Sequence, residues 1–335
     1  MKIVTLSDVR ALMLRVGLAE WYRLLLSELQ QDFSQWQAFH KCPRHVTHYD
    51  HGVIELMPTS TDESYIFKYV NGHPNNPKKD LFTVVALGLL ADVDSGYPLM
   101  ISEMTLLTAL RTAATSALAS TYLARSDAKV FSIIGCGAQS EFQVMAHHYA
   151  MGIDHIRYYD TDPAAMDKFE ENLRIFDLTL TRCASIKNAI KGADIITTAT
   201  AAKQRATLLT PDQLAPGVHL NAIGGDCFNK TELDPAVLDA CKIVVEYKPQ
   251  TQQEGEIQQF PGEVHAELWE IVTGQAQGRE HADEVTLFDS VGFALEDYSV
   301  MKLLYRLMQQ YQLGQSLDLL PPQGHDPKLL FSLLF

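Results

Sequence analysis

The chain has 335 residues, 47% of them hydrophobic, so it can bury the core of one large α/β unit or of two domains. Its 27 Lys and Arg against 41 Asp and Glu give a formal net charge of -14. Nucleic acids and anionic lipid surfaces are bound by clustered positive charge, so neither is expected as a partner. The acidic surface is expected mainly to serve solubility, although it would also attract a cationic substrate.

Cysteine usage and the first residues favour a reduced, cytoplasmic protein. The five cysteines are scattered and none has Cys-x-x-Cys spacing, so we expect neither disulfides nor a metal site. Charged side chains interrupt the N-terminus before an apolar run of signal-peptide length develops. The longest apolar stretch, Val84 to Ala91, is shorter than the roughly 20 residues that span a membrane as a helix. No membrane segment is therefore predicted.

The first third of the chain has the signals of a mixed α+β unit. Thr5 and Asp8 have the spacing of a capping box and apolar residues follow at helical spacing, so a helix should begin near Leu6. Four later segments have the composition of strands: 53–57, 65–70, 82–92 and 98–101. Residues 71–77 are dense in Asn, Gly and Pro, which predicts a loop.

From Lys129 onward, strand and helix signals alternate, which is typical of a parallel, doubly wound sheet. The strand-like segments are 130–134, 155–159, 194–198, 218–223, 243–246 and 285–288, and the helix-like segments are 140–151, 163–176 and 234–240. A helix of small residues at 104–124 is expected to bridge two domains, and a helical pattern at 293–312 to return to the first. We predict an α/β fold with a Rossmann-type domain at 116–299 and a mixed α+β domain formed by 1–115 together with 300–335.

A glycine turn follows the first strand of the predicted parallel sheet. Gly135 permits the tight turn, Gly137 lets the backbone approach a diphosphate, and the helix that begins near Ser140 offers free N–H groups. Ser140 stands where the third glycine of the dinucleotide fingerprint is usual, so an ordinary strand-to-helix turn stays an alternative.

The next strand ends at Asp160, where an acidic side chain accepts hydrogen bonds from the adenosine ribose and repels a 2′-phosphate. This position favours NAD over NADP. Asp160 could instead cap the helix that begins near Pro163. Thr200, after a later strand, is expected to cover the nicotinamide half, with a plain loop threonine as the alternative.

Asp226 is the candidate general acid and base. It follows Gly224 and Gly225 at the carboxyl end of a predicted strand, where open α/β sheets bind their ligands. Paired glycines allow the main chain to approach a cofactor ring, and a carboxylate there can move protons at an amine. The alternative is that Asp226 stabilises the turn or caps the helix near Leu233.

Six ordered segments resemble the ornithine cyclodeaminase/mu-crystallin family, and the resemblance spans nearly the whole chain. They are 52–58, 67–74, 111–113, 135–140, the Gly-Gly-Asp-Cys of 224–227 with 230–233, and 288–293. The resemblance implies a homodimer in which both chain ends build a substrate and dimerisation domain beside the Rossmann domain. It also implies that NAD is held tightly and recycled in each turnover.

Site roles follow from the same resemblance. Arg44, Lys68 and Arg111 would grip the substrate carboxylate, because converging cations orient the α-carbon. Asp226 would donate and accept protons, Val291 would lie near the substrate, and Glu55 would face the distal amine or orient Lys68. The implied cofactor residues are Thr83, Arg111, Thr112, Gly135, Gly137, Ala138, Gln139, Asp160, Thr200, Ile223, Gly224, Asp226, Lys230 and Ser290.

The implied activity is that of an ammonia-releasing lyase acting on a basic amino acid, ornithine by first choice. Hydride passes from the α-carbon to NAD⁺, the side-chain amine attacks the resulting iminium, ammonia leaves, and the hydride returns to give proline. Ring closure is intramolecular, so the protein mainly holds the substrate folded and excludes water.

Several alternatives stay open. A ketimine reductase using NAD(P)H or an alanine dehydrogenase would use the same carboxylate clamp, and a non-catalytic binding protein would resemble the mu-crystallin branch. Ornithine and lysine differ by one methylene, which is worth only about 1–3 kcal/mol in a pocket. The family usually has Pro-Gly where this chain has Phe228 and Asn229, so Phe228 could reshape the pocket, while Asn229 tolerates positive φ.

Overall fold

A seven-stranded sheet forms one half of the molecule. The computed structural model describes residues 1–200, 205–225, 227–322, 324 and 326–335. The strands are β1 (Lys2–Val4), β2 (His45–Tyr49), β3 (Gly52–Ser60), β4 (Ser64–Gly72), β5 (Ala86–Asp92), β6 (Pro98–Glu103) and β15 (Gln315–Ser316). Their order is β15-β1-β6-β5-β4-β3-β2, and the β1–β6 pair is parallel while the other pairs are antiparallel. Strands from near the two ends of the chain, β1 and β15, therefore pair in one sheet.

The strand expected from Phe82 begins later, at Ala86. The backbone before it is held by side chains and by the end of β4: Asn76 Nδ2 donates to the Phe82 carbonyl, and Val85 N donates to Asn71 Oδ1. Two backbone bonds also join the segment to the chain around the end of β4, from Asn71 N to the Val85 carbonyl and from His73 N to the Thr83 carbonyl, but residues 82–85 do not form a regular strand.

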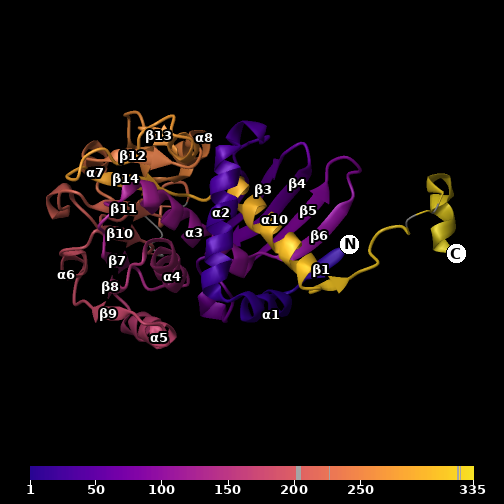
Figure 1. The fold of residues 1–335 in the computed structure, drawn as a ribbon, viewed down its shortest axis with the longest axis horizontal. Coiled ribbons are helices and arrows are strands. Elements are labelled where there is room, and N and C mark those ends of the chain that lie inside the picture. The colour runs from indigo at the N-terminus through magenta and orange to yellow at the C-terminus, as the bar shows by residue number, and fades with distance from the viewer. Residues whose placement is uncertain (201–204, 226, 323, 325) are drawn as a thin grey trace.

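Four long helices lie beside this sheet: α1 (Leu6–Val16), α2 (Leu18–Ser34), α3 (Thr105–Leu123) and α10 (Ala294–Gln310). The predicted capping box of Thr5 and Asp8 is confirmed at the start of α1. In Figure 1, α10 crosses the sheet, and it contacts β3, β4 and β5 as well as α2. The sequence analysis did not identify α2, whose buried face includes four apolar residues spaced four apart: Trp21, Leu25, Leu29 and Phe33.

An eight-stranded parallel sheet forms the other half. Its strands are β7 (Val130–Ile134), β8 (His155–Tyr159), β9 (Thr179–Arg182), β10 (Ile195–Thr198), β11 (His219–Ala222), β12 (Lys242–Val245), β13 (Ala266–Glu267) and β14 (Thr286–Asp289). Its helices are α4 (Ser140–Met151), α5 (Pro163–Leu173), α6 (Ile186–Ile190), α7 (Pro235–Asp239), α8 (Lys248–Glu254) and α9 (Leu268–Val272). The strand order is β13-β12-β14-β11-β10-β7-β8-β9. The order reverses between β7 and β10, which creates the crevice where such sheets bind ligands.

The helix α3 lies between the two sheets, beside α2 and α4 (Figure 1). Its small residues let neighbouring backbones approach closely, and Ala113, Ala114, Ala117 and Ala119 are fully buried. One hydrophobic core runs from β1 through α3 to the strands of the parallel sheet. Residues on the two sheets are thus held in fixed relation, which the site between them requires.

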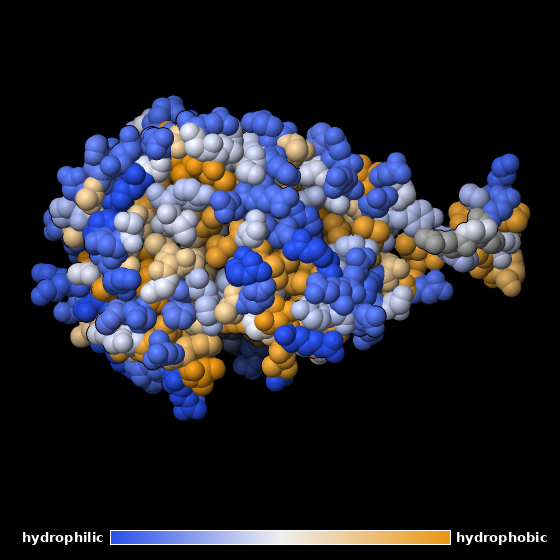
Figure 2. All heavy atoms as spheres, in the orientation of Figure 1, coloured by the Kyte–Doolittle hydropathy of each residue, from blue (hydrophilic) through white to orange (hydrophobic). Residues whose placement is uncertain are grey.

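The last residues extend away from this body (Figure 1), and Pro327–Leu334 form a short 3₁₀ helix. Figure 2 shows that the segment projects from the molecule with apolar atoms on its surface, where Phe331 and Phe335 are exposed. Within the residues that the structure describes, no helix combines the length and apolar character needed to cross a membrane.

Candidate functional site

The glycine turn after β7 has the geometry of a diphosphate cradle. Gly135 has φ +102°, and a Cβ there would lie 2.6 Å from the Ala199 carbonyl oxygen, so a larger residue would strain the turn. A Cβ on Gly137 would meet nothing within 4 Å, so the backbone faces open space. Ser140 Oγ donates to the Gly137 carbonyl at 2.7 Å and ties the turn to the start of α4. The first N–H groups of a helix have no partner within it, so the start of α4 adds donors of the kind that bind phosphate.

Asp160 lies at the end of β8, next to the turn. Its Oδ2 accepts a hydrogen bond from Cys136 N at 2.7 Å, and its Oδ1 accepts one from Asp162 N at 2.9 Å. The cap of α5 is Asp162, whose side chain accepts from Ala164 N. Asp160 is half-buried beside the cradle, which is where a ribose-binding acid lies in this fold.

The exposed Ala138 and the half-buried Gln139 complete this edge. Gln139 Nε2 donates to the Ala109 carbonyl of α3 at 3.0 Å, so the turn is fixed to the helix that also carries Arg111 and Thr112. These residues fit a dinucleotide, because the cradle is open, N–H groups line it and a carboxylate flanks it.

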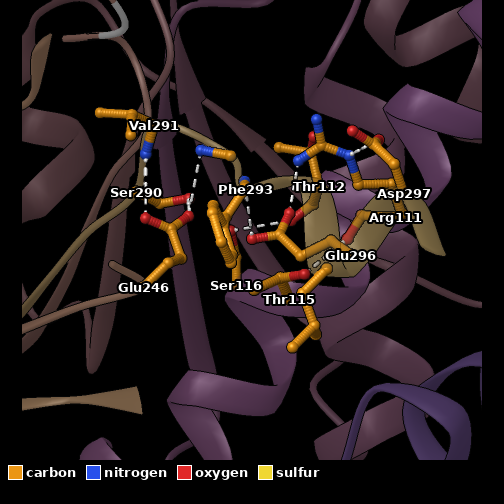
Figure 3. Close-up of polar contacts among 12 residues, drawn as sticks. Arg111, Thr112, Thr115, Ser116, Glu246, Ser290, Val291, Phe293, Glu296 and Asp297 are labelled. Atoms are coloured by element: carbon orange, nitrogen blue, oxygen red, sulfur yellow. Dashed lines mark hydrogen bonds and ion pairs between the residues drawn. The ribbon is translucent and has the colours of Figure 1, made fainter. Parts of the chain in front are cut away.

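Lys68, Arg111, Glu296 and Asp297 form a buried cluster where β4, α3 and α10 meet. The Asp297 carboxylate accepts hydrogen bonds from Lys68 Nζ at 2.9 Å and from Arg111 Nε at 3.0 Å. Glu296 accepts one from Arg111 Nη1. The four side chains are at most 4% exposed. Figure 3 shows the guanidinium of Arg111 against these two carboxylates of α10.

Arg44, just before β2, joins the same region to the turn after β14. Its Nη2 donates to the carbonyls of Val291 and Gly292 at 2.5 and 2.6 Å. Its Nη1 lies 3.0 Å from Glu55, and its Nε lies 3.2 Å from Glu254 of α8. Glu55 therefore pairs with Arg44, and the carboxylate that contacts Lys68 is Asp297.

The turn after β14 is held from the other side by Glu246, at the end of β12 (Figure 3). Its carboxylate accepts hydrogen bonds from Ser290 Oγ at 2.5 Å, Val291 N at 3.2 Å and Gly292 N at 3.1 Å. A Cβ on Gly292 would lie 2.5 Å from Arg111 Nη1, so this turn and the cation cluster are in direct contact. Ser290 and Val291 thus lie between the parallel sheet and the three cations.

Burial dominates the electrostatics of this region. Burial, with the nearby Arg111, lowers the pKa of Lys68 to about 8, although Asp297 acts in the opposite direction. Burial also raises the pKa of Glu296 to about 8, opposed by Arg111, and raises the pKa of Glu246. Charged groups whose pKa values lie near neutrality are typical of binding and catalytic sites.

A second set of buried carboxylates supports the loops that follow β10 and β11. Glu232 accepts hydrogen bonds from Thr200 N at 2.9 Å and from Thr200 Oγ1, and it packs against Gly224, where any Cβ would overlap its carboxylate. Glu256 accepts from Glu232 N at 2.6 Å. Burial raises the pKa of Glu256 to about 8. Thr200 and Gly224, two of the expected cofactor residues, are therefore fixed by one carboxylate.

Asp226, the expected acid and base, lies outside the described residues. Of its neighbours, Gly225 is buried, Ile223 and Lys230 are half-buried, and Ile223 N donates to the Thr198 carbonyl at 3.1 Å. The loop therefore leaves the carboxyl end of β11, as the sequence predicts.

Two expectations about this loop can be compared with the structure. Asn229 has φ +62°, the conformation that Asn was expected to tolerate. Phe228 is 67% exposed, so its side chain lies mainly in solvent and does not fill a buried pocket.

Thr83, another of the expected cofactor residues, lies in the loop before β5, where its carbonyl accepts a hydrogen bond from His73 N at 2.9 Å.

The sequence analysis missed four carboxylates of the site: Glu246, Glu254, Glu296 and Asp297. Glu296 and Asp297 directly follow the segment 288–293 and lie in the first turn of α10, where acidic residues are common because they stabilise the helix N-terminus. Because their position has this local explanation, the sequence gives no sign that they contact the two buried cations Lys68 and Arg111.

The comparisons with known proteins agree with this geometry. The model of the ornithine cyclodeaminase/mu-crystallin family matches residues 8–311. The chain belongs to this family. It is 49% identical over 332 residues to the ornithine cyclodeaminase of Brucella abortus biovar 1 (strain 9-941), covering 99% of this chain and 92% of that protein. The predicted family and the α/β, Rossmann-type fold class are confirmed.

Two solved structures superpose closely. A lysine cyclodeaminase, described for its recognition of L-lysine, L-ornithine and L-2,4-diaminobutyric acid, has a TM-score of 0.90 at 27% identity, and the match covers 98% of both chains. An archaeal alanine dehydrogenase dimer with bound NAD has a TM-score of 0.86 at 28% identity, covering 96% of this chain and 99% of that one. The same framework therefore occurs in proteins named for different amino acids.

Proposed function

We propose that this chain is an NAD-using enzyme that converts L-ornithine to L-proline and ammonia. The observation that carries the proposal is the convergence of Arg44, Lys68 and Arg111 beside the turn after β14, at the same edge of the sheet as the glycine turn. The 49% identity to an ornithine cyclodeaminase over nearly the whole chain supports the choice of substrate.

The carboxylates of the site favour a substrate with a second amine. Within the described residues, the three cations are paired with four buried carboxylates: Glu55, Glu254, Glu296 and Asp297. A distal ammonium group of the substrate can form an ion pair with one of these carboxylates, whereas alanine has no distal amine. A diamino acid therefore makes an interaction in this site that alanine cannot make.

In the proposed mechanism, Lys68, Arg111 and Arg44 bind the substrate carboxylate and so fix the α-carbon. Glu55 faces the distal amine, and Val291 contacts the substrate chain. Asp226 takes the proton from the attacking amine and delivers one to the leaving α-nitrogen. Because the cluster is almost fully buried, water is kept from the reactive imine.

NAD, when bound, would accept a hydride from the α-carbon and return it to the cyclic imine. The residues proposed to hold it are Thr83, Arg111, Thr112, Gly135, Gly137, Ala138, Gln139, Asp160, Thr200, Ile223, Gly224, Asp226, Lys230 and Ser290. The division into a nucleotide domain at 116–299 and a substrate domain at 1–115 with 300–335 puts most of these residues on the former.

The chain is also proposed to form a homodimer through the outer face of the seven-stranded sheet. Along β3, β4 and β5 the side chains that face α10 are buried, while the alternate positions leave large apolar groups exposed. Leu56, Tyr65 and Leu87 are 42%, 40% and 52% exposed. An apolar sheet face of this kind is typical of a protein–protein interface.

One assay separates this function from its rivals. The purified protein is incubated with ornithine, lysine or 2,4-diaminobutyrate and a trace of NAD⁺, and ammonia, cyclic product and NADH absorbance are followed together. Ammonia and proline in equal amounts, many times the amount of NAD⁺, are expected. Stoichiometric NADH would indicate a dehydrogenase, and no turnover with retained NAD binding would indicate a binding protein.

A further inference from the structure

Asp297 occupies a position that neither the motif segments nor the expected site residues include. Its side chain is fully buried in the first turn of α10. Both of its oxygens lie 2.9 Å from Lys68 Nζ, and Oδ1 also lies 3.0 Å from Arg111 Nε. One carboxylate therefore joins two cations that come from β4 and α3, far apart in the sequence.

We propose that Asp297 is a positioning residue of the substrate clamp: it holds Lys68 and Arg111 side by side and keeps Lys68 charged, so that both present N–H groups to one substrate carboxylate. This inference rests on the proposed function. In the described part of the chain, the carboxylates of α10 engage Nε and Nη1 of Arg111, which leaves Nη2 to meet the substrate. The ammonium of Lys68 has three donors, so it too can bind Asp297 and substrate together.

The surroundings of Lys68 explain why a carboxylate is needed there. The charged groups around it are Arg111 on α3, Arg44 before β2, Glu55 on the same face of β3, and Glu296 and Asp297 on α10. Across the sheet, Met57 of β3 and Gly88 of β5 are its uncharged partners in register. Burial and the two arginines lower the pKa of Lys68, and Asp297 is the group that opposes them. Without this carboxylate, Lys68 would lose its proton at a lower pH.

A merely structural role is the competing explanation, because Asp297 also ties α10 to the sheet. The same helix offers a matched control on its other side. Asp32 of α2 is 1% exposed, accepts hydrogen bonds from Lys302 Nζ at 2.5 Å and Ser299 Oγ at 2.8 Å, and also anchors α10. Substitution at Asp32 removes another buried carboxylate that anchors α10, paired with a lysine that is 32% exposed, without touching the clamp.

The test compares Asp297→Asn with Asp32→Asn in the full-length protein loaded with NADH, which cannot accept a hydride from ornithine, so that binding is measured without turnover. The pKa of Lys68 is measured by NMR of ¹³C-labelled lysine, with Lys68→Met to assign the signal, and ornithine affinity is measured by calorimetry. In Asp297→Asn the Lys68 pKa should fall by about one unit or more from about 8, and ornithine affinity near neutral pH should fall roughly tenfold or more. Asp32→Asn should lower the melting temperature and leave both values unchanged.

Asp297→Glu restores the charge and keeps the test decisive if Asp297→Asn does not fold. It should return the Lys68 pKa toward the wild-type value while ornithine affinity stays reduced, because the longer side chain displaces the cations. A folded Asp297→Asn with wild-type Lys68 pKa, or an Asp297→Glu with wild-type affinity, overturns the proposal. The Lys68 pKa does not depend on turnover, so absence of proline formation by the wild-type protein overturns the proposed function alone.

Discussion

The glycine turn after β7 and the cation cluster around Asp297 bind their proposed ligands by different means. The turn presents backbone N–H groups that become available because Gly135 and Gly137 let the chain turn and open. The cluster presents cationic side chains from β4 and α3, each held by carboxylates of α10. A site made of backbone N–H groups is fixed by the local conformation of the chain, whereas a site made of charged side chains is fixed by partner side chains from distant parts of the sequence.

This contrast has a consequence for substitutions. A change in the glycine turn should affect the dinucleotide and leave the amino acid site intact, while a change at Lys68 or Asp297 should do the opposite. Four predictions test or sharpen this separation, beginning with the largest expected effect.

Asp226→Asn should abolish most of the turnover. The amide cannot move protons at the amine, and loss of a general acid and base typically lowers kcat by about 10²–10⁴-fold. NAD affinity, measured by fluorescence titration, should be retained. Asp234→Asn, which removes the helix-capping carboxylate of α7, is the matched control and should keep kcat. Near-normal proline formation by Asp226→Asn would remove this residue from the mechanism.

Gly135→Ala should weaken NAD binding. At φ +102° and with the Ala199 carbonyl 2.6 Å from the added Cβ, the turn is strained by about 1–3 kcal/mol, which corresponds to roughly fivefold to 150-fold in Kd. Gly152→Ala is the control: its φ is +67° but a Cβ there meets nothing within 4 Å, so it should lower stability and keep NAD affinity. Equal NAD affinities in the two variants would contradict a role for the turn in cofactor binding.

The KM for ornithine should rise as pH increases through about 8, because burial lowers the pKa of Lys68 to that value and only the ammonium form binds a carboxylate. The expected rise is about tenfold per pH unit until neutral Lys68 contributes nothing. Steady-state kinetics across this range provides the measurement. In Lys68→Met, KM should be high at every pH; a wild-type pH profile in that variant would exclude Lys68 as the titrating group.

The core of the parallel sheet should lose stability on acidification. Burial lowers the pKa of His147 from 6.5 to about 4, so the unfolded chain takes up a proton first. The stability is complete above about pH 6.5 and falls as pH decreases towards 4, by about 3 kcal/mol in total for this group. His147→Gln, which cannot titrate, should reduce the loss seen in denaturant unfolding, while Gln at the exposed position His155 should not. Identical pH profiles for wild type and His147→Gln would rule out His147 as the cause.

Local sequence patterns predicted the first elements of the eight-stranded parallel sheet well. The expected segments 130–134, 140–151 and 155–159 coincide with β7, α4 and β8, because a short apolar strand, a glycine turn and a helix start are all encoded by neighbouring residues. The helix α2 was not recognised, since Leu24, Leu25 and Leu26 in succession blur the helical period of its buried stripe.

The sequence by itself determined the fold class and the glycine turn, because each depends on residue type and local spacing, whereas the three cations were singled out only by the resemblance to the family. Only the tertiary structure decided which carboxylates hold those cations. Asp297 is separated from Lys68 by 229 residues and from Arg111 by 186, and its position in the first turn of a helix is explained equally well by capping. A contact of this kind forms only when α10 packs across the sheet, so no local sequence pattern predicts it.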